Sequence, residues 1–99
     1  DQSSIVPERL EVIHAYPNPF NQSVNLEFTL VNAGYAHLGI YDIAGRMVVS
    51  LIDQDLSAGV HKTFWDGSGG TKQSLPSGIY WAQLKTSDQL YSVKLLLLR

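Results

Sequence analysis

The chain ends in two apolar runs joined by a short polar segment, and no other feature constrains its fold so strongly. Residues 79–85 and 90–98 are rich in aromatic, β-branched and aliphatic side chains, whereas residues 86–89 between them are polar. Two such runs around a short polar turn predict a β-hairpin. Alternation along the first run places Tyr80 and Leu84 on the same face of the sheet.

The second run carries leucine on both of its faces. Alternation divides it into an inward set of Tyr91, Val93, Leu95 and Leu97 and an outward set of Lys94, Leu96 and Leu98. We expect the inward set to join the core. Natural strand edges normally avoid an apolar stripe such as the one that the outward leucines make. We therefore expect either another part of the chain or a partner to cover this stripe.

The rest of the chain repeats the strand signal and has no helical periodicity long enough to predict a helix. In the clearest strand, residues 23–30, polar side chains alternate with Val24, Leu26, Phe28 and Leu30. Further strands are expected at residues 10–16, 35–42, 47–52 and 60–66. Counted with the closing hairpin, about seven short antiparallel strands predict an all-β, immunoglobulin-like β-sandwich.

The connections between these strands add to the prediction. Pro17 and Pro19 remove two amide donors, so their segment cannot form a central strand. We expect the chain to cross there from one sheet edge to another, with Tyr16 and Phe20 both in the core. A second crossing between the sheets is expected over residues 67–78, because this segment is longer than a hairpin needs.

The length of 99 residues fits a single domain, and the composition excludes several functions. The seven lysine and arginine residues are scattered singly and the formal net charge is −2, so no basic stripe is present for nucleic acid. The chain has no cysteine and no apolar run that approaches a membrane span. We expect a linker from an upstream domain at residues 1–9 and one domain at residues 10–99. Since neither a signal peptide nor an initiating methionine is present, we expect a piece of a longer protein.

Candidate chemical groups are few. The chain has three histidines, His14, His37 and His61. They lie on different expected strands without the spacing of metal ligands, and we interpret them as strand residues opposite the apolar face. Asp53 and Asp55 begin an expected loop that runs to Gly59. They serve there either as turn formers or as part of a calcium site.

Two glycine-containing segments are interpreted as turns. Residues 66–70 lack the lysine and the following helix that a phosphate loop requires. Gly45 is expected at positive φ in a tight connection. Asn21-Gln22-Ser23 fits the glycosylation acceptor pattern, which is frequent by chance. No serine, carboxylate pair or metal cluster has the setting of an active site, so we expect no catalysis, no cofactor and no metal.

Three outward apolar side chains form a candidate surface patch. Trp65 is expected in the core, whereas Phe64, Ile79 and Trp81 point away from it and together would make an apolar patch. Three interpretations of this patch stay open: packing beneath a loop or crossover, docking of a partner or neighbouring domain, and stacking of sugar rings.

Five segments occur in an order and at a spacing that resemble a known family. They are Tyr-Pro-Asn-Pro-Phe-Asn at residues 16–21, Ile-Tyr-Asp-Ile-Ala-Gly-Arg-Met-Val at 40–48, Gly-Val-His-Lys-Thr-Phe-Trp-Asp-Gly at 59–67, Leu-Pro-Ser-Gly-Ile-Tyr at 75–80 and Lys-Leu-Leu-Leu-Leu-Arg at 94–99. The series resembles the type A C-terminal sorting domain of the type IX secretion system and the related immunoglobulin-like domain of flagellar hook-capping proteins. The short ending from lysine to arginine favours the sorting domain. The motif residues to which the resemblance gives a structural role are Pro17, Asn18, Pro19, Asp42, Gly45, Trp65, Gly78 and Tyr80.

The resemblance implies a signal rather than a catalyst. Such domains end proteins that Bacteroidetes-like bacteria export through the periplasm to the cell surface or medium. Recognition by the outer-membrane secretion machinery is implied at Lys94, Leu95, Leu96, Leu97, Leu98 and Arg99. Cleavage of the upstream cargo domain by a sortase-like protease is implied in the linker before Leu10. The alternative function is an accessory carbohydrate-binding or structural β-sandwich module of a secreted polysaccharide-degrading enzyme. A second copy of the domain, in a homodimer formed through the last strand, is a further candidate partner.

Overall fold

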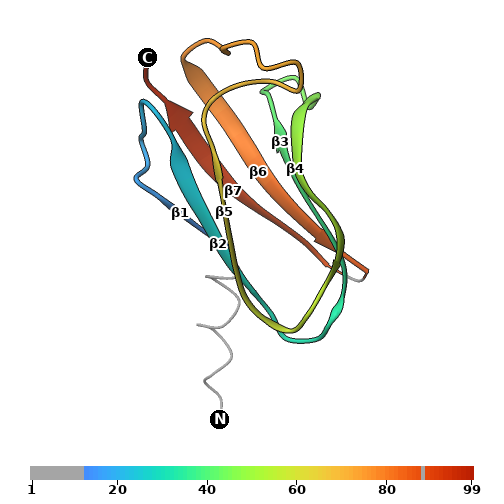
Figure 1. The fold of residues 1–99 in the computed structure, drawn as a ribbon. Coiled ribbons are helices and arrows are strands. Elements are labelled where there is room, and N and C mark those ends of the chain that lie inside the picture. The colour runs from blue at the N-terminus through green and yellow to red at the C-terminus, as the bar shows by residue number, and fades with distance from the viewer. Residues whose placement is uncertain (1–12, 88) are drawn as a thin grey trace.

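Alternating apolar residues build seven antiparallel strands, and these strands form two facing sheets (Figure 1). The structure is a computed structural model that describes residues 13–87 and 89–99. The strands are β1 (Ile13–Tyr16), β2 (Val24–Leu30), β3 (Gly34–Tyr41), β4 (Met47–Leu56), β5 (Gly59–Trp65), β6 (Gly78–Thr86) and β7 (Leu90–Leu97). The predicted all-β, immunoglobulin-like sandwich is confirmed.

The strand order shows where the chain changes sheets. One sheet has the order β1-β2-β5 and the other the order β4-β3-β6-β7. The connection of residues 66–77 therefore carries the chain from one sheet to the other, as its length predicted. The closing hairpin is also confirmed, because β6 pairs with β7 in a register that joins Gly78 to Leu97 and Lys85 to Leu90.

The core fills the space between the sheets with the inward side chains that alternation predicted. Its fully buried members, each at most 1% exposed, are Val24, Leu26, Phe28, Ala36, Leu38, Ile40, Ala82, Leu84, Leu95 and Leu97. Burying a leucine or phenylalanine side chain contributes about 1.5–3 kcal/mol, so these strands are held together by their shared apolar face.

Three aromatic rings close one end of this core. The ring of Trp65 lies 5.6 Å from the ring of Phe20 and 5.1 Å, edge to face, from the ring of Tyr80. All three side chains are buried, which confirms the core positions expected for Phe20 and Trp65. Tyr16 was expected in the core as well, and this prediction is wrong. Ile13 and Ala15 of β1 face the core, so alternation turns Tyr16 to the outer face. Its side chain is 39% exposed there, and its hydroxyl donates to Glu27.

The predicted loop over residues 53–59 is also wrong. Strand β4 continues to Leu56, and only Ser57 and Ala58 connect it to β5. The polar side chains of Asp53 and Asp55 favoured a loop, but both residues pair with β3 and point to solvent. The expected linker at residues 1–9, and the first three residues of the strand expected at 10–16, lie outside the described residues.

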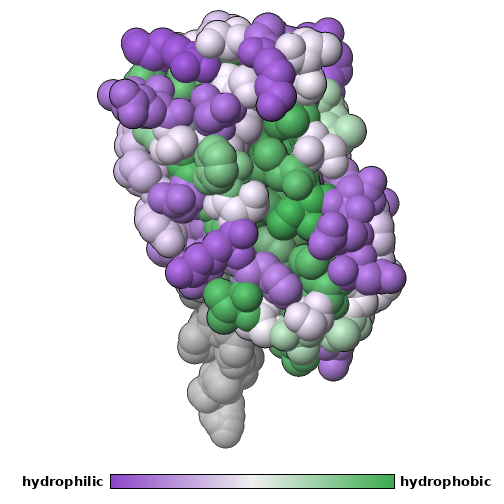
Figure 2. Space-filling view, viewed as in Figure 1, coloured by the Kyte–Doolittle hydropathy of each residue, from purple (hydrophilic) through white to green (hydrophobic). Residues whose placement is uncertain are grey.

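The side of the sandwich between β4 and β5 is less completely closed than the rest. Apolar side chains from β4, and one from the connection between β5 and β6, are half-buried there and pack against the core. They are Val48, Val49, Leu51, Ile52, Leu56 and Leu75. Figure 2 shows an apolar band along this side of the molecule, flanked by polar side chains.

Candidate functional site

The terminal strand β7 presents one row of side chains to the core and the other to solvent. Leu95 and Leu97 are fully buried, whereas Lys94 is exposed, Leu96 is half-buried and Leu98 is 48% exposed. This is the arrangement that alternation predicted. The terminal segment is therefore anchored by two leucines and displays the side chains on either side of each.

Strand β6 extends the displayed surface sideways. Ile79 pairs with Leu96 and Trp81 pairs with Lys94 across the β6–β7 ladder. Ile79 is 41% exposed and Trp81 is 37% exposed. Directly paired residues on one face of an antiparallel sheet lie close enough for their side chains to touch. The outer face of the four-stranded sheet thus carries one continuous apolar surface beside Lys94.

Phe64 does not belong to this surface, so the predicted three-residue patch is corrected. Its side chain is 59% exposed, as expected for an outward residue. However, β5 belongs to the three-stranded sheet, where Phe64 pairs with Asn25 and Asn25 pairs with Tyr16. Phe64 and Trp81 therefore project from opposite sides of the sandwich. The crossing expected over residues 67–78 already implied that the two strands belong to different sheets, and the three-residue patch was inconsistent with that crossing.

The edge of β7 is covered by the proline-containing segment of the chain. The side-chain amide of Asn18 donates from Nδ2 to the carbonyl of Lys94 at 2.7 Å, and its Oδ1 accepts from the amide of Leu96 at 3.0 Å. An asparagine side chain that both donates and accepts in this way imitates the backbone of a neighbouring strand. The peptide bonds before Pro17 and Pro19 are both cis.

The backbone of Phe20 continues the cover where Asn18 ends. Its amide donates to the carbonyl of Leu96 at 3.0 Å, and its carbonyl accepts from the amide of Leu98 at 2.8 Å. Phe20 consequently forms an isolated parallel bridge with Leu97. The backbone edge of β7 from Lys94 to Leu98 is thus covered from within the chain, whereas the expected cover of the leucine stripe by another part of the chain is incomplete, because Leu96 is only half-buried and Leu98 is 48% exposed.

The end of the terminal segment is tied to the connection between β5 and β6. The guanidinium of Arg99 donates from Nε to the carbonyl of Leu75 at 2.9 Å and from Nη2 to the carbonyl of Gly67 at 2.7 Å. The amide of Arg99 donates to Oγ of Ser77 at 2.8 Å. Hydrogen bonds from a charged donor are stronger than neutral ones. Arg99 is therefore engaged with its own domain.

That connection has an internal structure of its own. The indole Nε1 of Trp65 donates to the carbonyl of Ser68 at 2.8 Å, and the hydroxyl of Ser68 donates to Asp66 at 2.5 Å. This hydroxyl is the main reason why the pKa of Asp66 lies below its ordinary value. The glycine-rich segment is thus a turn, as its sequence indicated, and not a phosphate loop.

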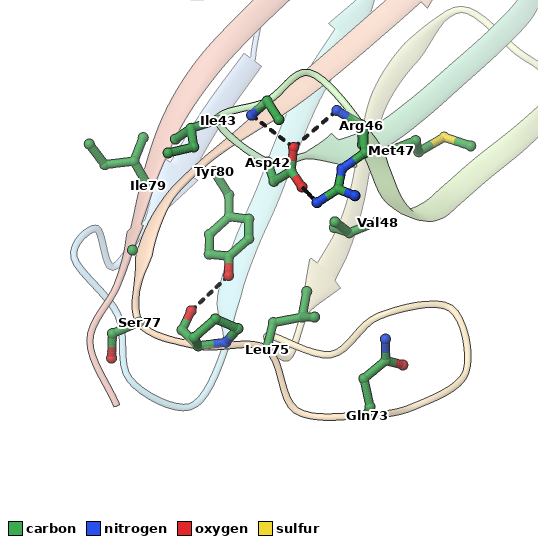
Figure 3. A pocket seen from close by; sticks show the side chains of 13 residues that line it. Asp42, Ile43, Arg46, Met47, Val48, Gln73, Leu75, Ser77, Ile79 and Tyr80 are labelled. Atoms are coloured by element: carbon green, nitrogen blue, oxygen red, sulfur yellow. Dashed lines mark hydrogen bonds and ion pairs between the residues drawn. The ribbon is translucent and has the colours of Figure 1, made fainter.

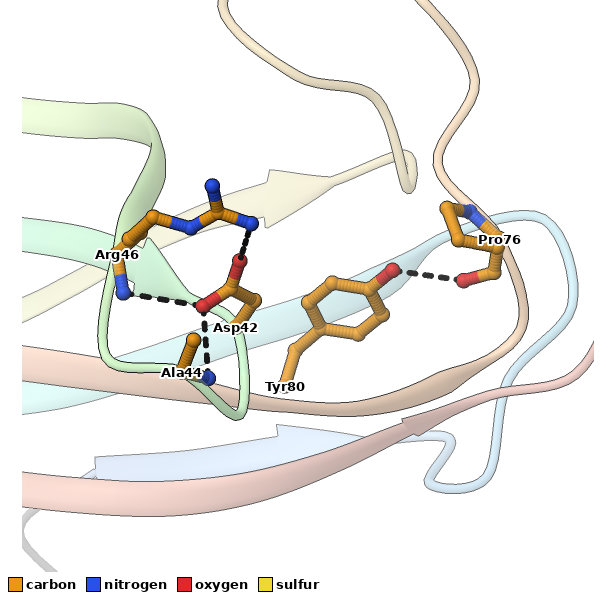
Figure 4. A network of polar contacts seen from close by, with 5 residues as sticks. All are labelled: Asp42, Ala44, Arg46, Pro76 and Tyr80. Atoms are coloured by element: carbon orange, nitrogen blue, oxygen red, sulfur yellow. Dashed lines mark hydrogen bonds and ion pairs between the residues drawn. The ribbon is translucent and has the colours of Figure 1, made fainter.

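The motif residue Asp42 organises the turn between β3 and β4 (Figure 4). Its Oδ1 accepts from the amides of Ala44 at 2.9 Å and Arg46 at 3.0 Å, and its backbone pairs with Arg46 and Gly45. The Arg46 amide, more than the Arg46 guanidinium, keeps the pKa of Asp42 below its ordinary value, although burial opposes the shift. Gly45 has φ of 84°, which confirms the positive φ expected there.

The motif residue Tyr80 fixes the start of β6. Its hydroxyl donates to the carbonyl of Pro76 at 2.7 Å, and burial raises its pKa. A tyrosine that bonds the backbone a few residues upstream is typical of immunoglobulin-like sandwiches. Tyr80 also lines a pocket of about 610 Å³ between the Asp42 turn and the connection, with Met47, Val48 and Leu75 among its walls (Figure 3).

The polar candidates do not converge on a catalytic or metal site. The tyrosine hydroxyl of Tyr35 donates to Asp53, and His37 bonds to Ser50 on the outer face of the four-stranded sheet. The ring of His61 bonds to the carbonyl of Ser57 instead. In the part of the chain that the structure describes, no three histidine or acidic side chains gather as metal ligands would. Within that same part, no helix is long and apolar enough to cross a membrane.

These observations define a class of protein first: an immunoglobulin-like module whose most distinctive surface is a displayed terminal strand. The family model described as the secretion system C-terminal sorting domain matches residues 14–98, and the chain belongs to this family. A domain of this family is a non-catalytic C-terminal sorting signal of the type IX secretion system, and it directs export to the cell surface or the medium. No curated protein matches the chain in sequence.

Two solved structures from Porphyromonas gingivalis have a similar fold. The crystal structure of dimeric latent PorU matches with a TM-score of 0.67 and 17% identity, covering 87% of this chain and 9% of that one. PorZ, a surface component of the type IX secretion system, matches with a TM-score of 0.68 and 17% identity, covering 98% of this chain and 13% of that one. At this identity the likeness shows the fold alone. The chain spans about a tenth of the length of either protein.

Sequence reasoning selected Asn18 and Arg99 but missed what they contact. It gave Asn18 a structural role without a partner, and it did not single out Leu75 or Ser77. The partners lie 22 to 78 residues apart along the chain. The only sequence signal was the setting of Asn18 between two prolines, which leaves its side chain as the principal hydrogen-bonding group there.

Proposed function

We propose that the outer-membrane secretion machinery recognises the segment Lys94–Arg99 as the folded sandwich displays it. The observation that carries this proposal is the division of the segment into buried and displayed side chains. Leu95 and Leu97 are fully buried, so a partner that meets the folded domain can contact Lys94, Leu96 and Leu98 but not the two leucines between them. In this view Leu95 and Leu97 act through the fold.

The neighbouring side chains on β6 extend the proposed recognition surface. Ile79 pairs with Leu96, and Trp81 pairs with Lys94, so a partner that covers the terminal strand also meets these two residues. Exposed aromatic side chains beside apolar ones favour protein docking. We therefore assign Ile79 and Trp81 to partner docking, in preference to sugar binding or packing beneath a loop.

A reporter fused upstream of the domain tests this surface in a host with type IX secretion. Leu96→Ser and Leu98→Ser should leave the domain folded and reduce export, with the reporter held in the periplasm. The matched control is Leu90→Ser, because Leu90 is 60% exposed on the outer face at the other end of the same strand. Leu90→Ser should export at the normal rate.

The outcomes of this experiment are separable. Reduced export of folded Leu96→Ser and Leu98→Ser, with normal export of Leu90→Ser, supports recognition of the terminal surface. Normal export of all three variants, in a host where deletion of the whole domain abolishes export, contradicts it. The folded state of each variant is checked by its thermal unfolding midpoint.

We also propose that a sortase-like protease removes the domain by cutting the linker before Leu10. The support is compositional: residues 1–9 are mostly polar and contain Pro7, which is typical of an accessible linker between domains. Mass spectrometry of the released reporter should find its new end within residues 1–9. A released reporter that still carries the sandwich would contradict cleavage.

A homodimer through the last strand is proposed with a restricted interface. The edge of β7 from Lys94 to Leu98 already bonds to Asn18 and Phe20, so a second copy would add beside the first half of the strand or displace that cover. Sedimentation of the purified chain at increasing concentration tests this proposal. A single monomeric species at all concentrations would contradict it.

A further inference from the structure

The hydrogen bonds of Arg99 suggest how the end of the recognition segment is held. Two different nitrogens of its guanidinium donate to two carbonyls, those of Leu75 and Gly67. The side chain thereby joins the beginning and the end of the connection between β5 and β6. Arginine presents several donors in a rigid planar fork, whereas lysine presents a compact point charge on a flexible stem. The contact is therefore specific to the shape of the arginine side chain as well as to its charge.

The position of Gly67 is built around this guanidinium. Gly67 is buried, has φ of 81°, and a Cβ added there would lie 2.7 Å from Nη2 of Arg99. Its carbonyl also accepts from the amide of Leu75 at 3.0 Å, so one carbonyl closes the connection on itself and holds Arg99. A side chain at this position would have to push the guanidinium away.

We propose that Arg99 is a positioning residue of the sorting signal, which holds the end of the terminal segment against the connection of residues 66–77 so that Leu96 and Leu98 are displayed in a fixed place. This inference rests on the proposed function, because it concerns how the same surface is presented. It differs from the simpler view in which the secretion machinery reads the positive charge of Arg99 directly.

Two substitutions separate positioning from direct reading of the charge. Arg99→Lys keeps the charge but cannot reproduce both bonds of the guanidinium. Gly67→Ala keeps Arg99 itself and displaces its guanidinium. The matched control is Gly45→Ala, because Gly45 has φ of 84° and nothing within 4 Å of an added Cβ. This control introduces the same backbone strain at a turn that Arg99 does not contact.

Each variant is studied as the reporter fusion, with two measurements. Hydrogen exchange at the amides of Leu75 and Gly70 reports on the connection, because these amides bond to Gly67 and Val48 respectively. The rate at which the reporter reaches the cell surface reports on the signal. We expect Arg99→Lys and Gly67→Ala to speed exchange at Leu75 about tenfold and to slow export about tenfold, as loss of a charge-assisted bond predicts. Gly45→Ala should change neither measurement.

The results distinguish failure of this inference from failure of the proposed function. Export of Arg99→Lys at the normal rate, with faster exchange at Leu75, overturns the positioning role. Unchanged exchange at Leu75 in Arg99→Lys would show that the hydrogen bonds of Arg99 do not hold the connection in place. This measurement remains decisive if Gly67→Ala does not fold. Slow export of Leu96→Ser and Leu98→Ser with normal export of Arg99→Lys defeats the inference alone. Normal export of the two serine variants defeats the proposed function.

Discussion

Adjacent residues of the terminal strand have opposite roles, because a strand turns successive side chains to opposite faces. Leu97 is fully buried against the core, whereas Leu98 is 48% exposed. Leu98 borders a shallow depression that Pro17 and Pro19 also line. At the scale of single residues, the same amino acid therefore supplies stability at one position and surface at the next.

The first prediction compares these two leucines. Leu97→Ala should lower the free energy of unfolding by about 2–5 kcal/mol, because it leaves a cavity in a packed core. Leu98→Ala should lower it by less than about 0.5 kcal/mol, as is usual for exposed positions. Urea unfolding followed by tryptophan fluorescence measures both values. Equal losses at the two positions would show that the strand faces are assigned wrongly.

The second prediction concerns the pH dependence that Asp42 confers. Because amides of the turn hold its pKa below the ordinary value, the ionised carboxylate stabilises the fold at neutral pH, and this contribution disappears as the pH falls through the lowered pKa. Asp42→Asn should therefore lower the thermal midpoint at pH 7 and have progressively less effect below about pH 4.

Arg46→Ala is the control for the role of Asp42. It removes the exposed ion pair, in which Nη2 of Arg46 lies 3.3 Å from Asp42, but keeps the backbone amides that bond the carboxylate. Exposed ion pairs contribute little, so the midpoint should change only slightly. A loss as large as that of Asp42→Asn would assign the stabilisation to the ion pair.

At the scale of whole elements, the treatment of the β7 edge is the main feature. An uncovered edge strand presents free amides and carbonyls to any passing strand. In this domain the segment around Asn18 and Phe20 supplies partners for four of those groups, on Lys94, Leu96 and Leu98. The cover leaves the outward side chains of β7 displayed, so edge protection and surface display coexist in one strand.

The third prediction tests this edge cover. Asn18→Ala removes two hydrogen bonds and should destabilise the domain by about 1–3 kcal/mol. It also leaves Lys94 and Leu96 with free backbone groups, so the variant should self-associate at lower concentration than the wild type. Sedimentation measures this change, with Asn21→Ala as a matched exposed asparagine nearby. Identical association of both variants would mean that Asn18 does not protect the edge.

At the scale of the whole molecule, the two ends of the described chain depend on one another. Strand β7 supplies two fully buried leucines and the bridge partner of Phe20, and it also contacts β1. The terminal strand is therefore part of the fold that displays it. Under the proposed function, the signal is therefore complete only after the chain has folded.

The fourth prediction follows from this dependence. Deleting residues 90–99 should abolish the cooperative unfolding transition, because it opens the core along the whole of β6. Deleting only residues 98 and 99 should leave a folded β protein with lower stability, since the Arg99 contacts are lost but every strand remains. Far-ultraviolet circular dichroism and thermal melts measure both deletions. A cooperative melt of the longer deletion would show that β7 is dispensable for folding.

Apart from the end of β4 after Ile52 and the outward position of Tyr16, the sequence by itself determined which of the described residues form strands and which face of each strand is buried. Alternation at Val24–Leu30 and in the closing hairpin is local, and the hydrophobic effect acts on it wherever the strand is placed. The long connection likewise predicted one place where the chain changes sheets. The proline pair did not mark a second one, because the chain reaches the edge of β7 at Phe20 and then returns in β2 to the sheet of β1. The ordered motifs were sufficient to identify the family that the comparison with known proteins confirmed.

Only the tertiary structure decided which strands are neighbours and which distant groups meet. It brought the side chain of Asn18 and the backbone of Phe20 to the edge of β7. It also extended β4 beyond Ile52 to Leu56, because the backbone hydrogen bonds to β3 outweigh the turn preference of the polar residues in this segment. These outcomes depend on pairing between residues far apart in the chain. The alternation of side chains within one strand does not indicate which other strand or residue will lie beside it.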